Sequence, residues 1–268
     1  MSNILTPEVF ASIIDFTLLT PTTTRADVRK LCEEAKEISA GSVCVHPGRI
    51  LEVASYLSEL KFHPKVSAVV DFPFGLSFTY TKVEQAHRLL ENGADELDMV
   101  ANTGFLKEGA TKKYQDDICA VAQEVKSQGG LLKVIIETCY LTREEKITAA
   151  QAVANVGREL QIPIFVKTST GYGTPKEGPK GATVEDILLI REAVGPYSAE
   201  NPIGIKASGG ISDAETALKM IYAAGLLGPD GTPYTPARDL VRIGATSGKK
   251  IYEEFSQKWR AAREELVH

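Results

Sequence analysis

The sequence is poor in the residues that build disulfide frameworks and metal centres. Its 268 residues include four cysteines and four histidines. The cysteines lie far apart without paired spacing, so we expect buried free thiols in a reducing compartment. They are Cys32, Cys44, Cys119 and Cys139. The histidines are also scattered; His46, before Pro47, is expected to face solvent rather than line a site. We therefore predict a reaction without a metal.

Long apolar runs and an excess of positive charge are also missing. No segment approaches the roughly 18 apolar residues of a membrane span, and residues 1–10 do not resemble a signal peptide. The formal net charge is -5, which disfavours nucleic acid as a partner. We expect a soluble, cytoplasmic protein that has no membrane or nucleic-acid partner.

Apolar β-branched runs alternate with helical patterns along the whole chain, and no linker divides them. This order predicts one α/β domain over residues 1–268, folded as a (β/α)₈ TIM barrel. A doubly wound sheet is the competing fold, but no dinucleotide-type glycine motif follows an early strand. The expected strands are Ile13–Phe16, Ser42–His46, Lys65–Phe72, Glu96–Val100, Leu132–Thr138, Ile164–Thr170, Pro202–Ser208 and Leu240–Thr246.

Two lysines stand near the ends of late strands, each followed by a turn that contains glycine. Lys167 ends Ile-Phe-Val-Lys, and Lys206 ends Ile-Gly-Ile-Lys. In a barrel, catalytic groups come from the carboxyl ends of the strands, where Asp98 also lies. Side chains alternate across a strand, so inward-facing Asp98, Lys167 and Lys206 would meet at the barrel mouth.

Two amines and a carboxylate suit imine chemistry. A free lysine, with a pKa of about 10.4, is almost entirely charged at neutral pH. Burial and a nearby like charge can lower that pKa by roughly 2–4 units, which frees a nucleophilic amine. We expect Lys206 to supply the charge and Asp98 to relay protons to Lys167. The alternative is that both lysines reach solvent, the more common fate of any single lysine.

Three glycine-rich turns follow the last three expected strands, and each is expected to precede a helix. They are Ser169–Gly171, Ser208–Asp213 and Gly244–Gly248. Glycines let main-chain N–H groups approach a phosphate, and a helix N-terminus adds a favourable dipole. Ordinary helix-cap chemistry, with Ser212 or Asp213 as the cap, explains one such turn. Three turns together favour a phosphate ester.

Several segments, in order and spacing, resemble the deoxyribose-phosphate aldolases of the class I, Schiff-base-forming type. The resemblance covers most of the chain. The segments that carry it are SVCVHP, ELDMVAN, KVIIETCYLT, FVKTSTG, GATVEDI, GIKASGG and RIGATSG.

The resemblance implies a role for each matching residue. Lys167 would form the Schiff base, Lys206 would perturb its pKa and relay protons, and Asp98 would join the relay. The residues implied to bind phosphate are Gly171, Gly209, Gly210, Gly244, Thr246 and Ser247. The implied reaction is reversible cleavage of 2-deoxy-D-ribose 5-phosphate to D-glyceraldehyde 3-phosphate and acetaldehyde, without a cofactor, in deoxyribonucleotide catabolism.

The chain departs from the family pattern in places. IDFTLLTP carries Phe16 and Thr20 where the family usually has histidine and lysine, and neither position carries the imine. The loop Gly173–Gly181 is long; Lys176 or Lys180 could cover the phosphate, although a solvated loop is the default. Gly225–Ala237 is a second extended segment. The chain ends without the terminal tyrosine of some members.

Two other functions stay open at this point. One is a different Schiff-base barrel aldolase, of the transaldolase or fructose-bisphosphate type, which would use a longer donor than acetaldehyde. The other is a barrel that binds sugar phosphates without catalysis, against which the paired lysines count. A homo-oligomer is also left open, because the residues do not define the oligomeric state.

Overall fold

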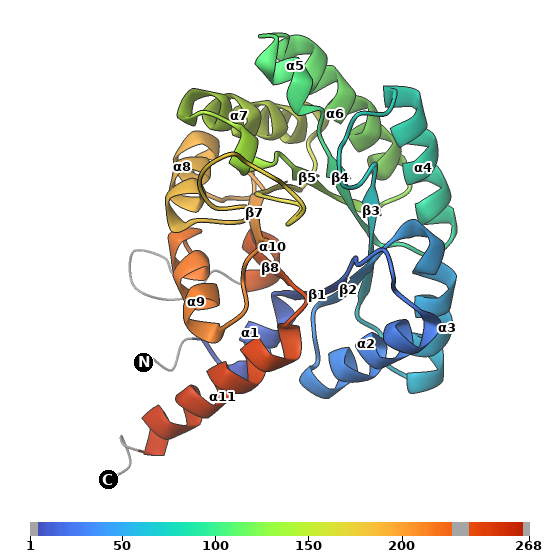
Figure 1. Ribbon diagram of the computed structural model, residues 1–268, viewed down its shortest axis with the longest axis vertical. Helices are drawn as coiled ribbons and strands as arrows, with labels where there is room; N and C mark the ends of the chain where they lie inside the picture. The colour runs from blue at the N-terminus through green and yellow to red at the C-terminus, as the bar shows by residue number, and fades with distance from the viewer. Residues whose placement is uncertain (1–4, 227–235, 265–268) are drawn as a thin grey trace.

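The computed structural model describes residues 5–226 and 236–264, and these form a closed barrel of eight parallel strands (Figure 1). Each strand pairs with the next along the chain, and β8 pairs with β1. The predicted (β/α)₈ fold is therefore confirmed. The remaining residues of the expected 1–268 domain, including most of Gly225–Ala237 and the chain end, lie outside the described residues.

Eight strand positions match the expectation, but several ends move by a few residues. The first strand begins and ends later than predicted, and the third, fifth and sixth end earlier. At the fifth and sixth strands, the residues that follow are already part of the barrel-mouth loops. The strands are β1 (Ile14–Leu18), β2 (Ser42–Val45), β3 (Lys65–Val70), β4 (Glu96–Val100), β5 (Leu131–Ile135), β6 (Ile164–Lys167), β7 (Ile203–Ser208) and β8 (Val241–Ala245).

Helices surround the strands on the outside of the barrel (Figure 1). Three of them, α1, α5 and α10, are short helices that the periodicity did not predict. The helices are α1 (Pro7–Ser12), α2 (Arg25–Ile38), α3 (Ile50–Leu60), α4 (Thr79–Glu91), α5 (Thr103–Lys107), α6 (Thr111–Ser127), α7 (Arg143–Leu160), α8 (Val184–Val194), α9 (Ala214–Ala223), α10 (Ala237–Leu240) and α11 (Gly248–Glu264). None of the described helices is long and apolar enough to cross a membrane.

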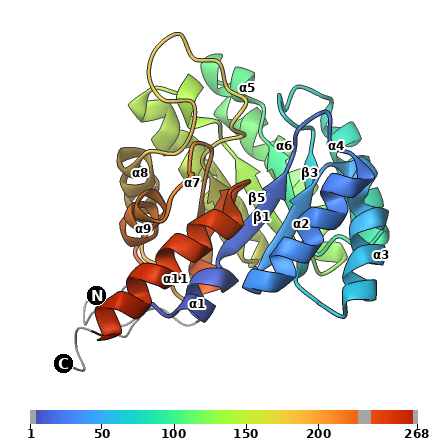
Figure 2. The ribbon, with the colours of Figure 1, turned by 60° about the horizontal axis from the view of Figure 1, so that its bottom comes forward.

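Helix α2 shows how local sequence produces this outer layer. Thr24 caps its first turn in a capping box with Asp27, which satisfies main-chain N–H groups that have no partner inside the helix. Its buried residues, which recur at helical spacing on one face, are Val28, Leu31, Cys32, Ala35 and Ile38. The first and last helices also pack together: Phe10 of α1 stacks on Phe255 of α11 with ring centroids 4.1 Å apart. Figure 2 shows these two helices side by side.

Strand alternation separates an apolar outer layer from a polar interior. On β4, Leu97 and Met99 join the main apolar core under the helices, whereas Glu96 and Asp98 do not. The same division holds on β6, where Ile164 and Val166 belong to that core and Phe165 and Lys167 face the barrel axis. Bulky branched residues usually fill the interior of such barrels. Here much of that space is occupied by charged side chains.

Candidate active site

Lys167 and Lys206 are direct register partners on β6 and β7, and both side chains reach the same carboxylate. Asp98 on β4 accepts a hydrogen bond from Lys167 Nζ at 2.6 Å and another from Lys206 Nζ at 2.8 Å, both at Oδ2. All three side chains are buried. The structure thus brings together the three residues that the sequence singled out, and neither lysine reaches solvent as the alternative supposed.

The pKa values of the two lysines shift in opposite directions. Burial lowers the pKa of Lys167, and the Lys206 ammonium adds to this against the opposing effect of Asp98. Burial alone would also lower the pKa of Lys206, but the carboxylates of Asp15 and Asp98 outweigh it and raise that pKa. Despite its burial, Asp98 has a pKa well below its usual range because Lys133, Lys167 and Lys206 surround it. Lys167 therefore gives up its proton more readily than Lys206, which stays charged.

Beneath these residues lies an ionic layer that the sequence reasoning missed. Arg242 contacts Asp15 through Nη1 at 2.7 Å and Glu96 through Nη2 at 3.0 Å. Lys133 Nζ contacts Glu96 at 2.7 Å, Asp98 at 3.0 Å and Asp15 at 3.4 Å. Strand alternation was the signal available for all four, since each is a charged residue at an inward-facing position of a strand that is otherwise largely apolar. These residues lie further down the barrel than the carboxyl ends of the strands, where catalytic groups are expected.

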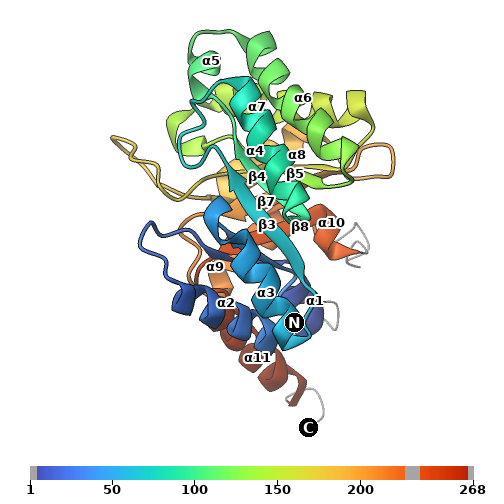
Figure 3. The same cartoon turned by 90° about the vertical axis from the view of Figure 1, so that its right-hand side faces the viewer.

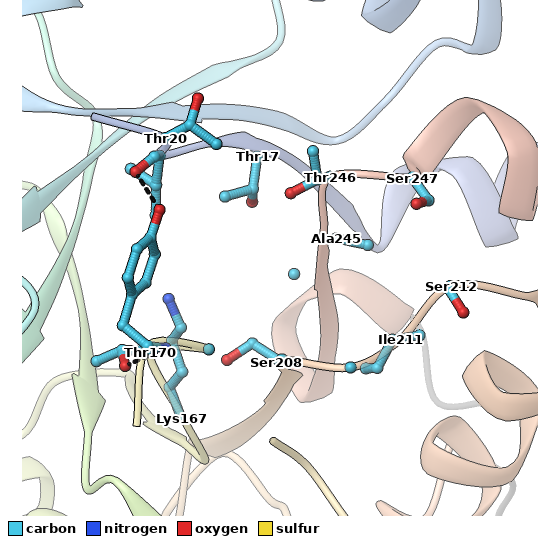
Figure 4. Close-up of a pocket in the computed structure, with 16 residues that line it drawn as sticks. Thr17, Thr20, Lys167, Thr170, Ser208, Ile211, Ser212, Ala245, Thr246 and Ser247 are labelled. Carbon is cyan, nitrogen blue, oxygen red and sulfur yellow. Dashed lines mark hydrogen bonds between the residues drawn. The ribbon is translucent and has the colours of Figure 1, made fainter. Parts of the chain in front are cut away.

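A cavity of about 430 Å³ opens above Lys167, at the carboxyl ends of β1, β6, β7 and β8. Figure 4 shows the Lys167 amine pointing into it, with Ser208, Thr246 and Ser247 around the opening. Every residue proposed to bind phosphate lines this cavity. Its lining contains Lys167 and no carboxylate among the described residues. An anion entering here meets one buried amine, several hydroxyl groups and glycine main chain.

Helix positions at this rim favour an anion. The turn at Ser208–Ser212 leads into α9, whose N-cap is Asp213, and the turn at 244–247 leads into α11. Two long helices therefore begin beside the cavity, and the positive ends of their dipoles lie near it. The prediction that the first turn also precedes a helix is wrong, because the loop 172–183 separates Gly171 from α8.

Two glycines are required by close packing. Gly209 has a φ of +84°, and a Cβ placed on it would lie 3.0 Å from Gly181 Cα. A Cβ on Gly244 would lie 3.0 Å from Lys206 Cε. Glycine at position 244 therefore leaves room for the buried lysine, and glycine at position 209 lets the long loop return across the cavity edge.

The long loop between β6 and α8 projects from the barrel mouth (Figures 2 and 3). Tyr172, at its start, donates a hydrogen bond to the Leu19 carbonyl at 2.7 Å and so spans one side of the cavity. Lys176 and Lys180 are exposed and do not line the cavity. In this structure they lie on a solvated loop, which is the default expectation.

Glu137, just after β5, holds Thr170 in place at the rim of the mouth cavity. Its φ of +53° lies in the left-handed region, which a non-glycine residue seldom adopts. Its carboxylate accepts hydrogen bonds from the Thr170 N–H at 3.2 and 3.3 Å and from the Thr170 hydroxyl. Burial raises the pKa of Glu137. This contact fixes Thr170, which lines the cavity.

Two expectations about isolated residues need correction. All four cysteines are free, but Cys119 and Cys139 are only partly buried, because one lies on α6 and the other in a turn at the barrel mouth. His46 is half-buried rather than solvent-facing, and its Nε2 lies 2.8 Å from the Leu19 carbonyl oxygen. The described residues hold no cluster of three His, Cys, Asp or Glu side chains suited to a metal ion.

A buried amine of lowered pKa at the floor of an anion-accepting barrel mouth has the features of a class I aldolase site. Residues 10–254 match the model of the DeoC/LacD family aldolases. The chain belongs to that family.

The relatives found by sequence carry a narrower name. The deoxyribose-phosphate aldolase of Thermococcus gammatolerans is 44% identical over 243 residues, which is 91% of this chain and 95% of the relative. That of Aciduliprofundum boonei is 45% identical over the same shares of the two chains. Among solved structures, the tetrameric deoxyribose phosphate aldolase of Aeropyrum pernix matches with a TM-score of 0.75 and 28% identity, covering 94% of this chain and 93% of that one.

Proposed function

We propose that this aldolase reversibly cleaves 2-deoxy-D-ribose 5-phosphate to D-glyceraldehyde 3-phosphate and acetaldehyde through a Schiff base on Lys167. The observation that carries the proposal is the buried Lys167 amine, held 2.6 Å from Asp98 at the floor of a cavity to whose lining the described residues contribute no carboxylate. The names of the relatives support deoxyribose 5-phosphate as the substrate.

In the cleavage direction, the neutral Lys167 amine adds to the aldehyde carbon C1 and loses water to form a cationic imine. Removal of the C3 hydroxyl proton breaks the C2–C3 bond, and its electron pair enters the imine to give an enamine. D-Glyceraldehyde 3-phosphate leaves with the new C3 carbonyl. Protonation of the enamine at C2 and hydrolysis then release acetaldehyde and restore the amine.

Proton movement falls to Lys206 and Asp98. Lys206 is charged and lies 2.8 Å from Asp98, so it is a proton donor beside an ionised acceptor. When the imine forms, Asp98 can exchange protons with Lys206 without leaving its place. The charge on Lys206 also lowers the pKa of Lys167, which favours the neutral amine between turnovers.

The phosphate group is assigned to the other side of the cavity. We place it among Gly171, Gly209, Gly210, Gly244, Thr246 and Ser247, beside the first turns of α9 and α11. Phosphate bound there positions C1 over Lys167, so binding energy remote from the reacting bond lowers the barrier. This mechanism requires no metal or organic cofactor.

A retro-aldol assay with deoxyribose 5-phosphate tests the proposal directly. Acetaldehyde and glyceraldehyde 3-phosphate should appear in equal amounts, and borohydride added during turnover should attach a two-carbon or five-carbon group to Lys167. A longer donor fragment would indicate a different Schiff-base aldolase. Binding of the sugar phosphate without turnover or label would indicate a non-catalytic barrel.

Location and assembly are proposals of the same kind. A cytoplasmic enzyme would meet its phosphorylated substrate inside the cell. The Aeropyrum pernix relative is tetrameric. For this chain we propose a homo-oligomer, which light scattering at assay concentrations will test.

A further inference from the structure

The interior of the barrel holds an ionic column of seven side chains, which extends from the floor of the mouth cavity to the opposite end of the barrel. It contains four bases and three carboxylates: Lys133, Lys167, Lys206 and Arg242 with Asp15, Glu96 and Asp98. We propose that Arg242 and Glu96, which do not touch the mouth cavity, are positioning residues whose charges fix the protonation state of Lys167. The inference rests on the proposed role of Lys167.

The column is continuous. Asp98 joins Lys167, Lys206 and Lys133, with N–O distances of 2.6, 2.8 and 3.0 Å. Asp15 joins Lys206 to Arg242, and Arg242 reaches Glu96 at 3.0 Å. A change of charge at Arg242 is therefore only two ion pairs away from Lys206. Lys206 and Lys167 in turn share the Asp98 carboxylate.

Burial makes the net charge of this column decisive. All seven side chains are almost completely removed from solvent, and an uncompensated charge in such a place is costly. With Lys167 neutral, three cations face three carboxylates and the seven side chains carry no net charge. Arg238 also reaches Glu96, at 3.6 Å, but its side chain is 33% exposed, so solvent screens its charge. Protonation of Lys167 would add one uncompensated positive charge. Arg242 is the group least able to release its proton, so it anchors this balance.

Two other titratable groups, Cys44 and Glu137, lie near Lys167 but outside the column. Cys44, on β2, is a buried thiol whose pKa is raised by burial, so it is uncharged at neutral pH. Glu137, at the mouth, is near enough to Lys167 for their charges to interact, but it bonds to Thr170 and joins no ion pair among the described residues. Ser67, on β3, contacts Asp98 and Lys133 through its hydroxyl group. Lys167 is the member of the column that opens onto the cavity and can exchange protons with substrate.

The proposal predicts opposite shifts for opposite charge removals. Arg242→Met leaves the column one positive charge short, which favours protonation of Lys167 and should raise its titration midpoint by about one pH unit or more. Glu96→Gln leaves an excess of positive charge and should lower the midpoint. The double variant restores the balance, so its midpoint should return towards that of the unmodified chain.

Trace labelling with acetic anhydride over a range of pH, read at the Lys167 peptide by mass spectrometry, measures this midpoint without requiring turnover. Failure of the proposed reaction would appear separately, as a missing borohydride adduct. Lys65→Met is the matched control: Lys65 lines, together with Glu96 and Arg242, a second cavity at the opposite end of the barrel from the mouth, and it pairs with Asp95 at 2.9 Å, but it lies outside the column. In the Lys65→Met variant, the titration midpoint of Lys167 should not change.

A folded Arg242→Met variant with an unchanged midpoint would overturn the proposal, and so would shifts of the same sign in Arg242→Met and Glu96→Gln. If Arg242→Met does not fold, the double variant and Arg242→Lys replace it. Arg242→Lys keeps the charge and should keep the midpoint, whatever happens to its melting temperature. A shift there, or a double variant that remains displaced, would assign Arg242 a structural role instead.

Discussion

The two ends of the barrel each carry a cavity of about 430 Å³, but their linings are opposite in character. The mouth cavity has one buried amine, hydroxyl groups and glycines, and no carboxylate among the described residues. The lower cavity contains charges of both signs, from Lys65, Asp95, Glu96, Arg242 and others. Volume therefore does not distinguish the two sites; their charge does.

In the lower cavity the charges are already matched to one another. Lys65 pairs with Asp95 at 2.9 Å, and Arg242 pairs with Glu96 at 3.0 Å. A phosphate entering there would have to displace these carboxylates. At the mouth, the helix N-termini and Lys167 meet no competing anion in the lining. The comparison explains why the reaction is assigned to the mouth.

Removing the amine at the mouth should have the largest effect. Lys167→Leu should reduce turnover of deoxyribose 5-phosphate by about four orders of magnitude or to background, because no other group at that position can form an imine. Steady-state assays and borohydride labelling provide the measurement. Lys176→Leu, on the exposed loop, is the control and should keep normal activity. Mapping of the label to a different lysine would show that the assignment is wrong.

Removing the neighbouring charge should have the next largest effect. The Lys206 ammonium lowers the pKa of Lys167, so Lys206→Leu should raise that pKa and leave less neutral amine near pH 7. We expect a loss on the order of 10²-fold or more near neutrality, with partial recovery as the pH rises and Lys167 loses its proton.

Lys206→Arg separates the two roles of this residue. Arginine keeps the charge but cannot readily give up a proton. High retained activity would mean that Lys206 acts as a charge alone, and low activity would mean that it also moves protons. A normal rate and an unchanged pH profile in Lys206→Leu would contradict the paired-lysine mechanism.

Introducing a carboxylate at the mouth should make it resemble the lower cavity. Ser247→Asp should raise the KM for deoxyribose 5-phosphate by about 10- to 100-fold, because an aspartate repels the phosphate. Unphosphorylated 2-deoxyribose should react far more slowly with the unmodified enzyme and should be much less sensitive to the substitution. Asp239→Asn, a charge change at the lower cavity, serves as control. Equal kcat/KM for both sugars would argue against the phosphate assignment.

Chelation should have the smallest effect. With imine chemistry at Lys167, EDTA is expected to leave the rate unchanged, since the cationic imine acts as the electron sink that a metal would otherwise supply. Assays after dialysis against EDTA measure this. Loss of activity that zinc restores would contradict a metal-independent reaction.

Sequence reasoning was strongest where chemistry and periodicity agreed. Lys167, Lys206 and Asp98 each stand out as charged residues near the ends of apolar strands, and the structure brings them together. It was weaker at boundaries: β6 ends at Lys167 rather than at Thr170, since residues beyond the lysine already belong to the rim. Glu137 could be noticed as polar, but its contact with Thr170 depends on two loops that are distant in sequence.

By itself, the sequence determined the barrel, the inward alternation of its charged residues and the site at the strand ends, because strand period and side-chain chemistry are local properties. The tertiary structure decided which charges share a partner. Asp15 and Arg242 lie 227 positions apart and meet only because β8 closes the barrel against β1. The protonation of Lys167 depends on distances and burial throughout that closed interior, and these exist only once the chain has folded.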